Sequence, residues 1–178
     1  MLALLALSRG IDRADDALGK AVSWLILAAV LVSSINAIVR YAFNLSSNAW
    51  LEMQSLLFGA VFLLGAGYTL LKNEHIRIDI VNSRLPRPLR DWIDILGHVL
   101  FVTPLCLIMI WLGFQFFFRS LALNEGSSSA GGLALWPGKL LVPLCFCILL
   151  AQTASELIKR VAVMRGLIDD PHAGLLPK

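Results

Sequence analysis

The sequence predicts an all-α integral membrane protein with four transmembrane helices, both termini in the cytoplasm and a short N-terminal interfacial helix. Hydrophobic residues make up 58% of the 178 residues and charged residues only 15%, whereas soluble domains carry about 25% charged residues. The charges are also absent from four long blocks and concentrated between them. A soluble core does not fit, because four such blocks in so short a chain leave few residues to cover them.

The four uncharged blocks give the predicted spans. They cover residues 21–39, 53–71, 95–118 and 140–155. A spanning helix needs about 20 mostly apolar residues, and the fourth block reaches that length only if its helix begins near Leu135. Trp136 suits the membrane interface and Pro137 suits a first helical turn, which supports that start. We therefore expect transmembrane helices at about 20–42, 49–72, 90–118 and 135–160.

The remaining segments form one membrane domain with these helices. Residues 2–18 are apolar and then charged, without the preceding basic region of a signal peptide, which indicates a helix lying on the inner membrane surface. Residues 73–88 form an inner elbow that ends in a proline-rich turn. The glycine- and serine-rich segment 119–134 is an outer loop, and residues 161–178 are a cytoplasmic tail.

The Lys and Arg residues predict the orientation. Twelve of the 15 lie before the first uncharged block, between the second and third blocks, or after the fourth block. The other three, Arg40, Arg119 and Lys139, belong to the two segments on the opposite side. Because basic residues are retained in the cytoplasm, both termini are expected there.

The first helix carries a small and polar face. Ala29, Ser33 and Ala37 follow the small-xxx-small spacing that lets helix backbones approach closely, and Asn36 and Arg40 lie on the same side. We expect this face to pack against another helix or subunit, and a face lining a substrate path is the alternative.

Two sets of polar residues flank the second helix. Arg40 and Glu52 are joined by a short loop, so they either form an ion pair or reach the lipid headgroups separately. In the elbow, His75, Arg77 and Asp79 are expected to contact a partner. A metal site needs three or four converging ligands, and no second His is suitably spaced.

The third and fourth helices carry polar groups near their inner ends. Asp91, Asp94 and His98 share one face, which fits acids at a helix N-terminus, a proton relay or a contact with basic residues of another chain. Pro104 is expected to kink the third helix. Gln152 and Glu156 are one turn apart, and either interhelical hydrogen bonding or interfacial solvation explains them.

The sequence contains few features of a catalytic or cofactor site. No nucleophile with an attendant base and no glycine-rich phosphate loop is visible, and no basic stripe with interleaved aromatics indicates a nucleic-acid partner. We expect no catalytic residues, metal or cofactor. A membrane anchor of a redox enzyme is the alternative, but a haem usually needs two axial ligands and only His98 is suitably placed. A thiol oxidoreductase needs cysteine pairs near the outer surface, whereas Cys106, Cys145 and Cys147 lie inside apolar blocks.

Several short motifs resemble a known family. They are Arg40-Tyr41-Ala42-Phe43-Asn44, Trp50-Leu51-Glu52, Gly65, Glu74-His75-Ile76-Arg77-Ile78-Asp79 and Trp136-Pro137. The chain resembles the small permease subunit of tripartite ATP-independent periplasmic (TRAP) transporters over nearly its whole length. One departure is Met53, where the family often has a second acid.

The resemblance implies a role as well as a fold. In this family a large permease subunit in the bacterial inner membrane carries the substrate and sodium sites and moves by an elevator mechanism. A periplasmic binding protein delivers the substrate, usually an organic acid. The small subunit is a multi-pass scaffold in contact with lipid that supports ion-coupled uptake and helps to dock the binding protein. The resulting interface candidates are Ser33, Asn36, Arg40, Glu52, His75, Arg77 and Asp79.

Overall fold

The computed structural model describes residues 1–44, 47–72 and 86–168. Within these ranges the chain is helical apart from its connections. The elements are α1 (Leu2–Phe43), α2 (Asn48–Leu71), α4 (Arg87–Gly97), a π-helix (His98–Val102), α5 (Thr103–Ala122) and α6 (Trp136–Met164). Because α4, the π-helix and α5 follow one another without a gap, the described elements supply four helices long and apolar enough to cross a membrane. The predicted all-α class and the four spans are confirmed.

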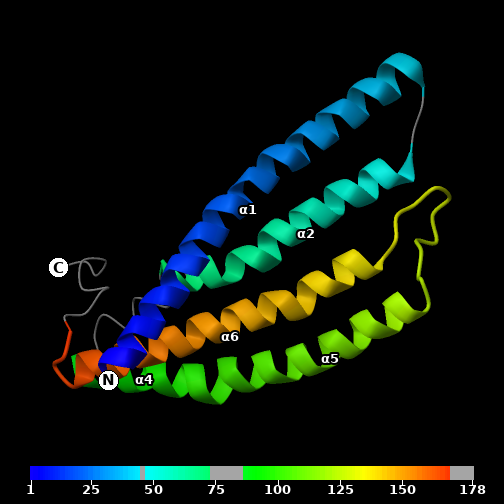
Figure 1. Ribbon diagram of the computed structural model, residues 1–178. Coiled ribbons are helices and arrows are strands. Elements are labelled where there is room, and N and C mark those ends of the chain that lie inside the picture. The colour runs from blue at the N-terminus through cyan, green and yellow to red at the C-terminus, as the bar shows by residue number, and fades with distance from the viewer. Residues whose placement is uncertain (45–46, 73–85, 169–178) are drawn as a thin grey trace.

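The helices lie side by side in the order α1, α2, α6, α5 (Figure 1). In addition, α1 crosses α6 close to the N-terminus. We call this end of the molecule the terminal end, because α1 begins and α6 ends there. The opposite end, with the α1–α2 connection and the segment joining α5 to α6, is called the loop end.

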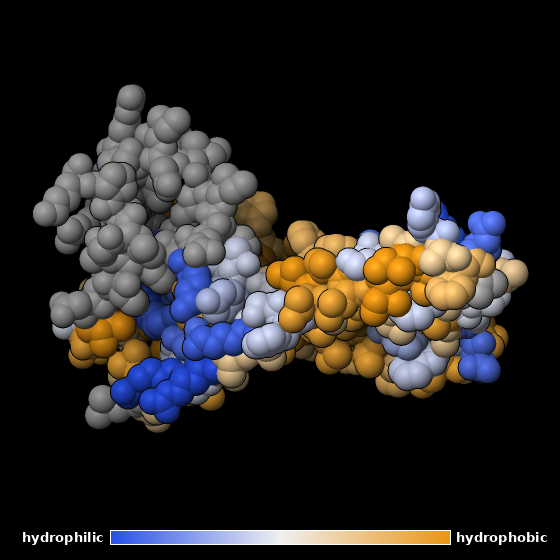
Figure 2. Space-filling model, turned by 90° about the horizontal axis from the view of Figure 1, so that it is seen from above, coloured by the Kyte–Doolittle hydropathy of each residue, from blue (hydrophilic) through white to orange (hydrophobic). Residues whose placement is uncertain are grey.

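Most of the apolar surface of this layer is exposed. Only 6% to 28% of each apolar span is buried inside the chain, and α6 is the most buried. Hydrophobic residues fill the middle of the molecule, while hydrophilic ones gather at the two ends (Figure 2). An apolar belt between polar ends matches a bilayer, whose hydrocarbon core offers no hydrogen bonds. Lipid or another membrane protein must therefore cover both faces.

The N-terminal segment differs from the prediction. Residues 2–43 form one continuous helix, not a separate interfacial helix at 2–18 followed by a span at 20–42. At 42 residues, α1 is about 63 Å long at 1.5 Å per residue. Its buried residues recur every seventh position, at Ser8, Asp15, Val22 and Ala29. This stripe continues across the boundary expected between residues 18 and 20. Because α1 packs against other helices on both sides of that boundary, it stays one helix.

The other boundaries shift by a few residues. The helix expected at 90–118 extends from Arg87 to Ala122, which shortens the loop expected at 119–134, and α6 continues to Met164. Pro86 immediately precedes α4, as its fixed φ favours. Most of the predicted elbow, and the tail from residue 169 onward, lie outside the described residues.

The third span is irregular next to its proline, as the sequence suggests. Pro104 has no N–H to donate to a carbonyl one turn earlier. His98–Val102 form a π-helix, and the N–H of the next residue, Thr103, bonds to the His98 carbonyl. The Thr103 hydroxyl donates to the same carbonyl at 2.8 Å. The irregularity is therefore a wide helical turn that ends at the proline.

The helices α5 and α6 approach closely at a glycine–proline contact. A Cβ at Gly113 would lie 3.1 Å from side-chain atoms of Pro143. Gly113 and Pro143 are both buried, and the Phe117 and Trp136 rings meet edge to face nearby. Because glycine has no side chain, the two backbones can approach closely at this point without a steric clash.

Candidate functional site

Polar side chains join helices at both ends of the layer. At the terminal end, Asp12 of α1 is the central acceptor. Its Oδ1 accepts hydrogen bonds from the Ser155 hydroxyl at 2.7 Å and from the Gln152 amide at 3.1 Å. Lys159 completes the group with an ion pair to Asp12 Oδ2 at 3.1 Å. Three residues of α6 thus converge on one carboxylate of α1.

Further contacts extend this group along the α1–α6 crossing. The Ser8 and Ser155 hydroxyl oxygens are 2.7 Å apart. Glu156 pairs with Lys159 at 2.5 Å and accepts from Gln152 at 3.1 Å. We call Ser8, Asp12, Gln152, Ser155, Glu156 and Lys159 the terminal-end cluster.

Three more ion pairs connect neighbouring helices at this end. Arg160 of α6 bonds to Asp91 at 3.1 Å and to Asp94 at 2.9 Å, both in α4. Asp16 of α1 pairs with Lys72, at the end of α2, at 3.1 Å. The face predicted from Asp91 and Asp94 therefore meets a basic residue of the same chain. His98 bonds through Nδ1 to the Asp94 carbonyl of its own helix at 2.7 Å.

At the loop end, Glu52 of α2 binds the segment between α5 and α6. The Leu133 N–H donates to Glu52 Oε2 at 2.7 Å, and the Ser127 hydroxyl donates to Oε1. The Asn48 amide donates to the Ala130 carbonyl at 3.1 Å. We call Asn48, Glu52, Ser127, Ala130 and Leu133 the loop-end cluster.

The loop itself is a compact turn. The Ser127 N–H bonds to the Leu133 carbonyl at 2.9 Å. Gly132 is required for close approach, because a Cβ there would lie 2.7 Å from Ser127 Oγ and 2.8 Å from Glu52 Oε1. Because Gly132 has no side chain, the Glu52 carboxylate can reach both sides of the turn, at Ser127 and at Leu133.

An ion pair supports the base of the loop. Glu125 pairs with Lys139 of α6, and the Leu135 N–H donates to the Glu125 carbonyl at 3.0 Å. The Lys139 ammonium also lies 4.0 Å from the centre of the Phe116 ring of α5. The hydrogen bond from Lys139 lowers the pKa of the Glu125 carboxyl below its usual value, so this carboxyl is ionised at neutral pH.

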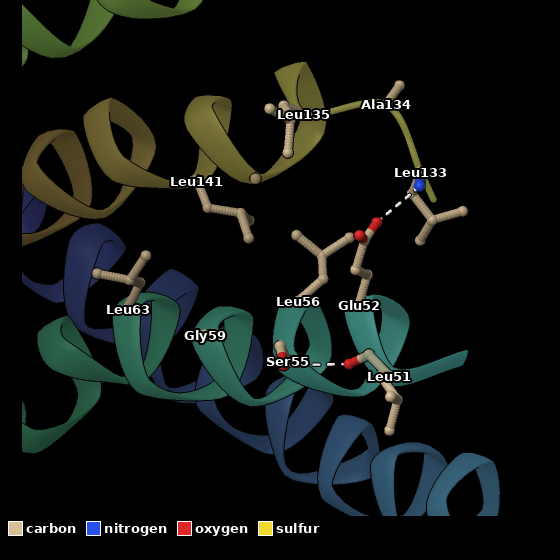
Figure 3. A pocket seen from close by; sticks show the side chains of 11 residues that line it. Leu51, Glu52, Ser55, Leu56, Gly59, Leu63, Leu133, Ala134, Leu135 and Leu141 are labelled. Atoms are coloured by element: carbon tan, nitrogen blue, oxygen red, sulfur yellow. Dashed lines mark hydrogen bonds between the residues drawn. The ribbon is translucent and has the colours of Figure 1, made fainter. Parts of the chain in front are cut away.

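An apolar groove of about 490 Å³ lies between α2 and α6 beside the loop-end cluster. Figure 3 shows leucine side chains around it, with Glu52 turned toward Leu133. The Ser55 hydroxyl already donates a hydrogen bond to the Leu51 carbonyl at 3.0 Å. Because the polar groups at its edge are already bonded, the groove suits apolar groups and offers little to a charged substrate.

The predicted first-helix residues separate into two environments. Asn36 continues the seven-residue stripe after the buried Ala29, and both Asn36 and Ser33 are half-buried. Ala37 and Arg40 are exposed. Within the part of the chain that the structure describes, Arg40 and Glu52 form no ion pair, because Glu52 turns to the loop. The predicted elbow residues His75, Arg77 and Asp79 lie outside the described residues.

Several polar residues were missed by sequence reasoning. Asp12, Lys159 and Arg160 are charged residues near the ends of apolar blocks, which is also where solvated charges occur. The available signal was the spacing of four residues between Ser8 and Asp12 and between Ser155 and Lys159, which places each pair on one face of its helix. No group of three or more metal-binding side chains occurs among the described residues.

The comparisons with known proteins agree with this architecture. No curated protein matches the chain. The family model for the DctQ component of tripartite ATP-independent periplasmic transporters matches residues 21–163, a range that reaches into all four spans. The resemblance seen in the short motifs is therefore confirmed, and the chain belongs to the DctQ family of TRAP transporter components.

Proposed function

We propose that this small TRAP subunit is a rigid scaffold for the large permease subunit during ion-coupled uptake of an organic acid in the bacterial inner membrane. The observation that carries the proposal is the joining of neighbouring helices at both ends of the layer. Asp12 links α1 to α6 at one end, and Glu52 links α2 to the α5–α6 loop at the other. Helices joined at both ends resist sliding past one another.

The broad apolar faces support the same role. Each span leaves most of its apolar surface outside the chain's own packing. The contacts of the terminal-end and loop-end clusters leave these apolar faces available to a membrane partner. We propose that the large permease subunit, with the substrate and sodium sites, covers part of this surface and that lipid covers the rest.

We further propose that the terminal end faces the cytoplasm. Lys72, Lys159 and Arg160 are at this end of their helices, and Lys20 shares its partner Asp16 with Lys72. The described basic residues near the loop end are Arg40, Arg119 and Lys139. The positive-inside rule favours this orientation. The loop-end cluster would then face the periplasm, where the binding protein delivers substrate.

The redox-anchor alternative receives less support. Membership in a transporter-component family favours transport. His98 is its one candidate haem ligand, whereas a membrane haem usually needs two axial ligands. An absorbance spectrum of the purified protein separates the two functions, because a Soret band would contradict the transporter assignment.

A reversible tether tests whether the chain acts as a rigid scaffold. The Ser8 and Ser155 hydroxyls are 2.7 Å apart, so the double variant Ser8→Cys/Ser155→Cys places two thiols side by side. The variant is made in a background lacking the three native cysteines, and reconstituted with the large subunit and binding protein in vesicles. Oxidation is expected to join α1 to α6 and leave the uptake rate of small carboxylates unchanged.

The opposite result would show that α1 moves on α6 during transport. In that case oxidation stops uptake and a thiol reductant restores it. The two single-cysteine variants control for oxidation elsewhere. Omission of this chain from the vesicles is expected to abolish uptake, and uptake without it would contradict a scaffold that the transporter needs.

A further inference from the structure

A buried carboxylate at the terminal end has no hydrogen-bond donor. Asp15 of α1 is 6% exposed, and its Oδ2 is buried without a partner among the described residues. A Cβ at Gly67 of α2 would lie 2.8 Å from this oxygen and 2.7 Å from Ile148 Cγ2 of α6. Asp15 therefore sits where three helices meet, in a space that glycine leaves open.

A second acceptor without a donor lies at the same helix crossing. Gln152 is fully buried, and its Oε1 has no partner among the described residues. Its amide nitrogen donates to Asp12 and Glu156, both at 3.1 Å. Asp12 is one helical turn from Asp15, and Gln152 is one turn from Ile148. The two orphaned oxygens thus belong to facing helices at one junction.

The charged groups around Asp15 are directed elsewhere. On α1, Asp12 pairs with Lys159 and Asp16 pairs with Lys20. At the end of α2, Lys72 pairs with Asp16 and lies 5.2 Å from the centre of the Tyr68 ring. On α6, Lys159 pairs with Glu156.

The surroundings of Asp15 therefore contain two further carboxylates on its own helix and no cation bonded to it within the described ranges. An ionised carboxylate is costly in such a place, because it is removed from water without hydrogen bonds in return. The same oxygen as part of a carboxylic acid has no charge to solvate and carries an O–H donor. One proton thus removes the charge and supplies the donor that this junction lacks.

We propose that Asp15 is a proton-binding site, held as an un-ionised carboxylic acid that donates a hydrogen bond within the α1–α2–α6 junction. Binding is a simple protonation of the carboxylate, with the proton taken from the solvent. Assembly of α1 onto α6 then requires this proton. As the pH rises and Asp15 is forced to ionise, contact between the two helices weakens.

Infrared spectroscopy of the purified full-length protein tests the protonation directly. The wild-type protein is expected to show the carbonyl stretch of an un-ionised carboxylic acid at mildly acidic pH, where surface carboxylates such as Asp16 are ionised. Asp15→Asn, which keeps the size and offers an N–H donor, is expected to lack this band. Asp16→Asn is the matched control, since Asp16 is 30% exposed and ion-paired, and it is expected to retain the band.

Thermal unfolding across pH provides a second measurement. The wild-type midpoint is expected to fall as the pH is raised from mildly acidic to neutral, because the proton that assembly requires is lost over this range. Asp15→Asn is expected to reduce this fall, while Asp16→Asn is not. Wild type without the acid band, or equal pH dependence in wild type and Asp15→Asn, would overturn the proposal. If Asp15→Asn does not fold, wild type with isotope-labelled aspartate decides the question, because the labelled acid band must be present at mildly acidic pH and disappear at high pH.

Discussion

The two ends of the helical layer are held by different kinds of contact. At the terminal end, side chains of one helix bind side chains of another, as in the ion pairs of Asp12 with Lys159 and of Arg160 with Asp91. At the loop end, side chains of α2 bind the backbone of a turn, through Glu52 to Leu133 and Asn48 to Ala130. Helices satisfy their own backbone groups, whereas a turn leaves some without partners. At the loop end one carboxylate is enough to hold a turn, whereas at the terminal end several side chains together join the helices.

The largest expected effect is removal of the central acceptor of the terminal-end cluster. Asp12→Ala leaves Lys159, Gln152 and Ser155 without their shared partner. Because the Asp12 side chain is 23% and Lys159 12% exposed, the loss should be about 3 kcal/mol, near the lower end for a broken buried pair. Chemical unfolding in mild detergent measures it.

The matched control for this variant is Asp16→Ala, whose partners Lys20 and Lys72 are 71% and 42% exposed. Exposed pairs contribute little, so this variant is expected to stay close to the wild type. Equal destabilisation by the two substitutions would remove the distinction between the buried cluster and an ordinary surface pair.

A smaller and more local effect is expected at the loop end. Glu52→Ala removes the acceptor of the Leu133 N–H and the Ser127 hydroxyl, so the turn should open while the helices remain. Hydrogen exchange should accelerate at residues 126–134 and stay unchanged in α6. Glu52→Gln, which can still accept one bond, should give an intermediate rate. If exchange accelerates equally throughout α2 and α6, Glu52 supports the whole layer and the comparison of the two ends fails.

The smallest expected effect comes from crowding the same turn. Gly132→Ala places a methyl group against Ser127 and Glu52 and should cost about 1 kcal/mol, as small insertions into packed sites do. Gly126→Ala is the control, because a Cβ there has nothing within 4 Å. Thermal unfolding and loop exchange should change only for Gly132→Ala, and a neutral result would mean that the turn shifts freely.

The sequence predicted the spans better than it predicted the contacts between them. Four charge-free blocks are sufficient to place four helices, because hydrocarbon excludes both charges and unpaired backbone. The N-terminal boundary was wrong because charges between Arg9 and Lys20 were interpreted as a surface segment. In the structure Asp12 and Asp15 face other helices, so the charges accompany a continuing helix.

The contacts were harder to predict because they join distant parts of the chain. Glu52 was considered beside Arg40, its neighbour across a short loop, but it binds residues 75 and 81 positions further along. For Asp91 a helix N-terminus, a proton relay and a contact with another chain were considered, whereas its partner is Arg160, 69 positions away in the same chain. Periodicity identifies a face, whereas the identity of what meets that face depends on how the helices are arranged.

The π-helix before Pro104 has a consequence for how the third span faces α6. Asp91 and His98 are seven residues apart, and so are the buried Cys106, Gly113 and Ser120, but His98 and Cys106 are eight apart. The wide turn absorbs this additional residue, which in a regular helix would rotate everything beyond it by about 100°. The two halves of the span thus keep a common orientation, with acids toward Arg160 in one and Gly113 toward Pro143 in the other. Deleting a single residue from 98–102 and restoring a regular α-helix would preserve both contact surfaces, whereas the same deletion elsewhere in the span would turn one of them toward lipid.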